Sequence, residues 1–231
     1  DLHSFPTRRS SDLVRGTQLS LVSTTVPLLH DYVLRMSTSV RLDGMQATQP
    51  THRMFIDCQN MTGGVDVRNF VMRNASQLSV FGSVKKSLAL RSGRVEADVI
   101  VDIRLPTMET LRIEHTTFTS ATVQIHPATI GSIRLSTVTF SQGSTFQVPN
   151  STLGTGTGDY AVNAYSTRFQ DSTTTMIFNG TTIAGGMLLY YYNPTNSRGT
   201  DSPTFLDGAQ LLLHHCNLSN PGGYALQMHY N

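Results

Sequence analysis

Residues that could carry acid–base or metal chemistry are sparse along this chain and form no compact motif. Only three of the 231 residues are glutamates. The aspartates in its hydrophobic segments are spread over different stretches: Asp57, Asp66, Asp98 and Asp102. An enzyme that works by acid–base or calcium chemistry needs clustered carboxylates, beside basic residues that stabilise a developing anion. Residues from separate segments can converge in a fold, so an enzyme stays open as an alternative.

Histidine and cysteine do not indicate a metal site either. His214 and His215 are adjacent, and adjacent residues of a strand point to opposite faces, so we do not expect them to share a metal ion. Cys58 and Cys216 stand far apart, each in an apolar segment, which is typical of buried thiols. We therefore assign no catalytic, metal-binding or cofactor-binding residue from the sequence.

Asn-x-Ser/Thr sequons are the clearest modification signal. The candidate N-glycosylation sites are Asn60, Asn74, Asn150, Asn179 and Asn217. Asn150 is the favoured acceptor in a secreted eukaryotic protein, because it lies in a predicted loop. For Asn60 and Asn217 we favour a corner asparagine that hydrogen-bonds its own backbone.

The composition predicts a weakly charged, polar surface. Charged residues make up 14% of the chain, the formal net charge is +2, and tryptophan is absent. The basic residues are scattered, so we do not expect a nucleic-acid partner. No apolar run approaches the ~18 residues that a membrane-spanning helix needs, so no membrane span is predicted.

A repeat is the most informative pattern in the chain. Residues 111–125 (LRIEHTTFTSATVQI) and 133–148 (IRLSTVTFSQGSTFQV) share an apolar-Arg-apolar start, a Thr-Phe pair and an apolar-Gln-apolar end. A looser copy covers 211–228. Short period-2 strands cannot bury their apolar side alone, so stacked copies must share a core.

Stacking of the copies assigns a direction to each side chain. We predict a core stack of inward apolar residues: Ile113, Phe118, Ile125, Leu135, Phe140 and Val148. Arg112 with Arg134 should form an outward row, as should the matching glutamines of the two copies. Stacked guanidinium groups repel, so we expect these arginines to splay or to pair with Glu114 or Glu109.

These features resemble the right-handed parallel β-helix of pectin-lyase-like enzymes and of many surface and adhesin proteins. The segment LLLHHCNLSNPGG, 211–223, is similar to a frequent rung of that class, with an apolar triplet, a Cys-x-apolar corner and an Asn/Gly turn. The resemblance implies an all-β, single-stranded solenoid of eight to ten coils of about 22 residues each. Ser/Thr-rich short-strand repeats also give a more distant resemblance to the dispersed gene family surface proteins of trypanosomatids.

A leucine-rich-repeat-like solenoid is the alternative architecture. The spacing Met108-x-x-Leu111-x-Ile113 fits that repeat, and the segment that begins at Ile130 fits it in the same way. The convex side of such a horseshoe often needs a helix, and no segment clearly supplies one.

The domain organisation follows from these patterns. Residues 1–13 (DLHSFPTRRSSDL) resemble the translation of a common sequencing adapter and are set aside as an artefact. Residues 14–39 are expected to form an N-terminal coil or a short helix or strand segment. Residues 40–231 are expected to form the β-helix fragment, with loops at 149–160 and 192–204.

Together these expectations favour a noncatalytic protein that is secreted or lies at the cell surface. A low-charge Ser/Thr-rich repeat without an acid–base cluster is typical of adhesion, recognition or a structural stalk, with glycans or other surface proteins as partners. The resemblance implies one alternative, a carbohydrate-active lyase or glycoside hydrolase of the pectin-lyase-like class. A groove that held three or more carboxylates beside an arginine would favour the enzyme.

Overall fold

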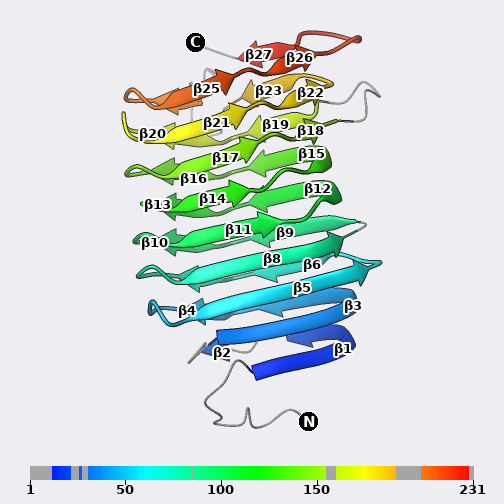
Figure 1. Ribbon diagram of the computed structural model, residues 1–231. Coiled ribbons are helices and arrows are strands. Elements are labelled where there is room, and N and C mark those ends of the chain that lie inside the picture. The colour runs from blue at the N-terminus through cyan, green and yellow to red at the C-terminus, as the bar shows by residue number, and fades with distance from the viewer. Residues whose placement is uncertain are drawn as a thin grey trace, which may run out of the picture.

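The chain folds into a solenoid of stacked β coils, shown as a computed structural model in Figure 1. The structure describes residues 12–21, 26–27, 31–84, 86–154, 160–190 and 204–228. Every regular element in these ranges is a β-strand, and the strands of successive coils pair in parallel. The predicted all-β parallel solenoid is therefore confirmed.

The solenoid is right-handed. In Figure 1 the chain climbs from the N-terminus at the bottom to the C-terminus at the top, and the front strands run to the right while the back strands return to the left. Right-handed crossovers are the usual result when twisted strands pair in parallel. The described residues contain no helix on any side, so the leucine-rich-repeat horseshoe is not formed. No helix in the described ranges is long and apolar enough to cross a membrane.

Three parallel ladders enclose the core, and we call their outer surfaces face 1, face 2 and face 3. Face 1 contains β1 (Asp12–Leu21), β3 (Asp31–Asp43), β5 (Arg53–Met61), β8 (Gln77–Val84), β11 (Ile100–Arg104), β14 (Thr122–Ile125), β17 (Thr145–Pro149), β21 (Thr175–Asn179) and β25 (Gln210–His214). Face 2 contains the later parts of β1 and β3, then β6 (Val65–Arg68), β9 (Ser87–Arg91), β12 (Thr107–Glu114), β15 (Thr129–Ser136), β19 (Val162–Tyr165), β23 (Met187–Tyr190) and β27 (Leu226–Met228).

Face 3 is a separate sheet of short strands. It contains β2 (Val26–Pro27), β4 (Met45–Ala47), β7 (Val71–Met72), β10 (Arg94–Glu96), β13 (Thr117–Thr119), β16 (Thr139–Ser141), β20 (Arg168–Gln170) and β24 (Phe205–Leu206). Three further strands line the corner between faces 1 and 2: β18 (Thr152–Leu153), β22 (Thr182–Ala184) and β26 (Asn217–Ser219).

The core consists of columns of like side chains from successive coils. All six residues of the predicted core stack are buried, and Ile113 pairs in register with Leu135. Phe118 pairs with Phe140, and their rings stack with centroids 4.7 Å apart. The column continues through Phe169 to Phe205, with centroid distances of 4.7 Å and 4.8 Å. Each fully buried side chain of this size favours folding by roughly 1.5–3 kcal/mol before chain entropy is counted.

Tight corners between the strands explain the abundance of small polar residues. At the corner from face 2 to face 3, successive coils each place one residue in the left-handed backbone conformation: Ser92 (φ 53°), His115 (φ 50°) and Thr137 (φ 56°). Buried hydroxyl groups accept hydrogen bonds from the backbone of the adjacent coil. The Ala121 N–H donates to Ser144 Oγ at 3.1 Å, and the Ala128 N–H donates to Ser151 Oγ at 3.2 Å. Serine and threonine are thus structural here.

Two expected boundaries differ in the structure. The solenoid already includes residues before 40, because β1 pairs with β3, in which Leu34 and Met36 are buried on either side of an outward Arg35. The loop expected at 149–160 is shorter, because Pro149 ends β17 and Leu153 is buried in β18. The remaining parts of the two predicted loops, 155–159 and 192–203, lie outside the described residues.

Candidate functional site

Face 1 carries a hollow of about 380 Å³ on its outer surface. Its lining residues come from three successive coils, on β5, β8 and β11: Phe55, Gln77, Ser79, Phe81, Asp102 and Arg104. Phe55 pairs in register with Ser79, which pairs with Asp102, while Phe81 pairs with Arg104. Residues distant in sequence therefore meet because they hold outward positions in adjacent rungs.

Polar contacts fix one side of this hollow. Asp102 is buried, and its Oδ2 accepts a hydrogen bond from Arg104 Nε at 2.8 Å. The second oxygen of Asp102 lies 2.8 Å from His126 Nε2, which reaches across from the residue after β14. Gln77 Nε2 donates to Ser79 Oγ at 2.8 Å. The two phenyl rings remain partly exposed, so the hollow presents an apolar surface beside an amide, a carboxylate and a guanidinium group.

A second carboxylate on face 1 lies beside the hollow. Asp57 is almost fully buried, and Arg35 Nε donates to its Oδ2 at 2.6 Å. The neighbouring thiol, Cys58, is also buried, and this burial together with the charge of Asp57 raises its pKa to about 12. A thiol with that pKa is protonated at neutral pH and is a poor nucleophile or metal ligand.

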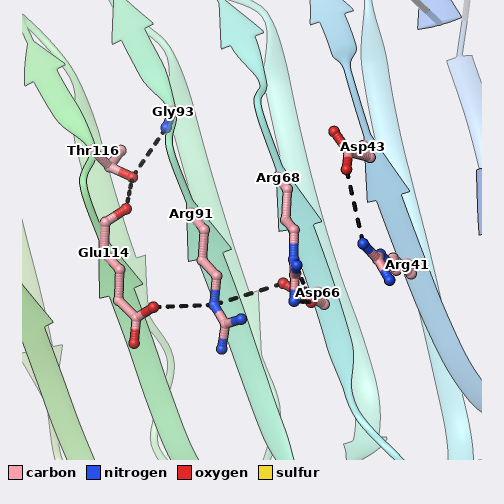
Figure 2. A network of polar contacts seen from close by, with 8 residues as sticks. All are labelled: Arg41, Asp43, Asp66, Arg68, Arg91, Gly93, Glu114 and Thr116. Atoms are coloured by element: carbon pink, nitrogen blue, oxygen red, sulfur yellow. Dashed lines mark hydrogen bonds and ion pairs between the residues drawn. The ribbon is translucent and has the colours of Figure 1, made fainter. Parts of the chain in front are cut away.

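Face 2 carries a network of ion pairs, which we call the ion ladder (Figure 2). Its residues come from β3, β6, β9 and β12: Arg41, Asp43, Asp66, Arg68, Arg91 and Glu114. Arg68 Nη2 lies 2.6 Å from Asp66 Oδ2, and this hydrogen-bonded contact raises the pKa of the guanidinium group. Arg91 Nε lies 3.2 Å from Glu114 Oε2 and 3.8 Å from Asp66 Oδ1. Stacking places Arg68 and Arg91 side by side, and the carboxylates of Asp66 and Glu114 compensate the two positive charges.

The row of arginines continues beyond the ion ladder. Arg112 and Arg134 pair in register on β12 and β15, as the repeat predicted. Of the two expected outcomes, splaying or pairing with Glu114 or Glu109, the pairing does not form: Glu114 binds Arg91, and no contact with Glu109 joins either arginine in the described part of the chain. Glu114 stands directly opposite Arg91 in the ladder and is already bound there, although Arg112 lies only two positions away along the same strand, the separation at which Arg41 pairs with Asp43.

The other predicted positions are distributed along the solenoid and do not form one site. Of the sequon asparagines, Asn74, Asn150, Asn179 and Asn217 are exposed, and the side chain of Asn60 lies outside the described part. Asn74 stands at a corner with φ 54° and donates to the Thr48 carbonyl at 2.9 Å. Glycosylation at these sequons stays a prediction.

The histidine pair does not converge with other ligands. His214 ends β25 on face 1, and His215 occupies the following corner with φ 51°. Within the residues described, no group of three or more histidine, cysteine, aspartate or glutamate side chains is placed to hold a metal ion.

Sequence reasoning missed the hollow because no linear motif encodes it. The run Met54-Phe55-Ile56 reads as continuous core, yet only its first and third residues are buried. The detectable signal was alternation around Phe81, where Leu78 and Val80 point inward.

Comparisons with family models, curated proteins and solved structures find no match. The surface chemistry of faces 1 and 2 is therefore the basis on which a function can be assigned to this chain.

Proposed function

We propose that this β-helix is a noncatalytic recognition protein of the cell surface or extracellular space, and that it binds glycans through the hollow on face 1. The observation that carries the proposal is the pairing of two partly exposed rings, Phe55 and Phe81, with the polar groups of Gln77, Asp102 and Arg104. Sugars present an apolar face of C–H groups and a rim of hydroxyls. A concave site with aromatic walls and a few fixed polar groups suits that chemistry.

The carboxylates near the hollow favour recognition over catalysis. Glycoside hydrolysis uses two carboxyl groups about 5–9.5 Å apart on either side of the scissile bond. Asp57 and Asp102 lie two coils and two residues apart in the ladder, with Cα atoms about 12 Å from each other, and the Asp57 carboxylate binds Arg35 on the coil farther from Asp102. Each carboxylate is also held by an arginine, Arg35 or Arg104, at 2.6 Å and 2.8 Å respectively.

Binding assays with matched variants test the proposal. The chain should bind at least one oligosaccharide on a glycan array, and calorimetry should then give its affinity. Phe55→Ala and Phe81→Ala should each weaken binding about tenfold or more, because an aromatic ring that a ligand buries contributes roughly 1.5–3 kcal/mol. Ile177→Ala, an outward change on a distant coil of face 1, should leave the affinity unchanged. A protein that binds no glycan, or binds equally well without both phenyl rings, would contradict the proposal.

A carbohydrate-active enzyme on the same fold is the second candidate. One observation favours it: buried Asp102 lies 2.8 Å from His126 Nε2 at the edge of the hollow, and such pairs can move protons in acid–base catalysis. Cleavage of polygalacturonate, tested with and without calcium, separates the two candidates. Turnover that Asp102→Asn abolishes would replace recognition by catalysis.

A further inference from the structure

A pair of arginines without a counter-charge is the main feature of face 2 that neither the fold nor the hollow explains. Arg112 and Arg134 are direct neighbours in the parallel ladder, about 4.8 Å apart at the backbone. In the part of the chain that the structure describes, neither side chain has an ion pair or a hydrogen bond. The Nε atom of Arg112 is buried without an acceptor, as are those of Arg41 and Arg91, but Arg41 and Arg91 each have a carboxylate within 4.0 Å and Arg112 has none. Water or a bound anion can supply the missing acceptor.

The ion ladder on the same face provides the internal comparison. Arg41 is 4.0 Å from Asp43, Arg68 is 2.6 Å from Asp66, and Glu114 is already bound to another arginine of the ladder. The fold therefore supplies carboxylates to the arginines of the earlier coils and none to Arg112 and Arg134. Two guanidinium groups on neighbouring coils can both donate to one carboxylate or sulfate.

An exposed aromatic surface lies on the next coil. Tyr165 pairs in register with Ser136, two residues along β15 from Arg134, and Asn163 pairs with Arg134 itself. The Tyr165 side chain is 44% exposed, and its ring stacks on Tyr190 with centroids 5.4 Å apart. A ring that another ring supports from behind is a rigid platform for a flat apolar partner.

We infer that face 2 carries a second binding site, specific for an acidic sugar unit of a glycan. The carboxylate or sulfate of that unit binds between Arg112 and Arg134, its ring packs on Tyr165, and Asn163 contacts its hydroxyl groups. The inference goes beyond the proposed function, because this site shares no residue with the hollow on face 1. It also specifies the chemical class of ligand, an anionic glycan, which the hollow does not.

The experiment compares three hexasaccharides against the full chain: hyaluronan (carboxylate), chondroitin sulfate (carboxylate and sulfate) and maltohexaose (neutral). At least one anionic hexasaccharide should bind about tenfold tighter than maltohexaose, and added salt should weaken it. Preference for hyaluronan identifies the carboxylate as the recognised group, and preference for chondroitin sulfate identifies the sulfate. Equal binding of all three would overturn the inference.

Variants locate the site. Arg112→Gln and Arg134→Gln should each weaken anionic binding about tenfold or more, and Tyr165→Ala should weaken it while Tyr165→Phe does not. Arg94→Gln is the matched control, because it removes the same charge from a side chain that is 62% exposed on face 3. An equal loss with Arg94→Gln would show nonspecific attraction and refute the site.

The two proposed sites can fail separately. Phe81→Ala should leave anionic binding unchanged, because Phe81 lies on β8 of face 1. If Phe81→Ala abolishes anionic binding, the ligand occupies the hollow and the second site is refuted. If both arginine variants lose anionic binding and neither phenyl variant does, the second site stands. The hollow is refuted separately, if no glycan that the chain binds loses affinity in Phe55→Ala or Phe81→Ala.

Discussion

Replacing Phe140 by alanine should destabilise the chain more than any comparable change at the ends of its phenyl column. Phe140 is fully buried, and its ring stacks at 4.7 Å on both Phe118 and Phe169. Phe146 adds an edge contact at 5.9 Å. The coils above and below are fixed by backbone ladders, so the cavity cannot collapse. Phe→Ala in such sites costs about 3–5 kcal/mol, and two lost stacks of about 0.5–1.5 kcal/mol each place this variant at the upper end.

The matched comparison is Phe205→Ala, since Phe205 is only partly buried and stacks on one ring. We expect about half the cost there, roughly 2 kcal/mol. Urea unfolding followed by far-ultraviolet circular dichroism gives both values from the shift of the midpoint. Most single domains have a stability of about 5–15 kcal/mol, so the difference is readily measured. A Phe140→Ala cost below about 1 kcal/mol, or no larger than that of Phe205→Ala, would refute the continuous column.

Two further predictions concern charge and thiol chemistry. Burial raises the pKa of Asp171, but hydrogen bonds from Thr173 and from the Gln142 backbone outweigh it and lower the pKa from 3.8 to about 2. Because the ionised form is favoured in the folded state, Asp171 stabilises the fold above about pH 4, and this stabilisation is lost as the pH falls towards 2. In Asp171→Asn the free energy of unfolding should therefore change less over this pH range than in the unmodified chain. Identical pH dependence of the two proteins would contradict the assignment. Cys58 is buried and its pKa is raised, so it should not react with a thiol reagent in the folded protein, whereas the partly exposed Cys216 should. Mass spectrometry after labelling measures the modification of each thiol. Rapid labelling of Cys58 would contradict the prediction and show that the coil around it opens.

The fold could be predicted because its determinants are local and repeated. The copies at 111 and 133 align with one shift of 22 residues as far as their Thr-Phe pairs, so Phe118 over Phe140 and Ile113 over Leu135 followed from the sequence. The hollow could not be predicted in the same way, because its rungs are separated by different chain lengths. Arg53 pairs with Gln77, but the next coil is one residue shorter. Because the coil length varies by one residue, no single shift of the sequence reveals which side chains of these coils are neighbours.

The partners of charged residues were equally hidden. Sequence proximity suggested Glu114 for Arg112, whereas the ladder sets Glu114 opposite Arg91. In a parallel solenoid the nearest neighbour of an outward side chain lies about 4.8 Å away on the adjacent coil, closer than the about 6.6 Å to the next outward residue of its own strand. Pairs between coils, such as Arg91 with Glu114, therefore follow the register, which only the structure provides, whereas Arg68 and Asp66 pair two positions apart within one strand.

Cross-linking between coils tests the central claim, that consecutive coils stack in a fixed parallel register and so assemble the outward rows. Gln124 and Gln147 are partners on face 1, and their spacing of about 4.8 Å suits a disulfide. In a Cys216→Ser background, Gln124→Cys with Gln147→Cys should oxidise readily without loss of β structure. The control pair, Thr122→Cys with Gln147→Cys, lies on the diagonal at about 8 Å and should not form a disulfide without distortion. Equal cross-linking of both pairs, or none with the first, would contradict the account.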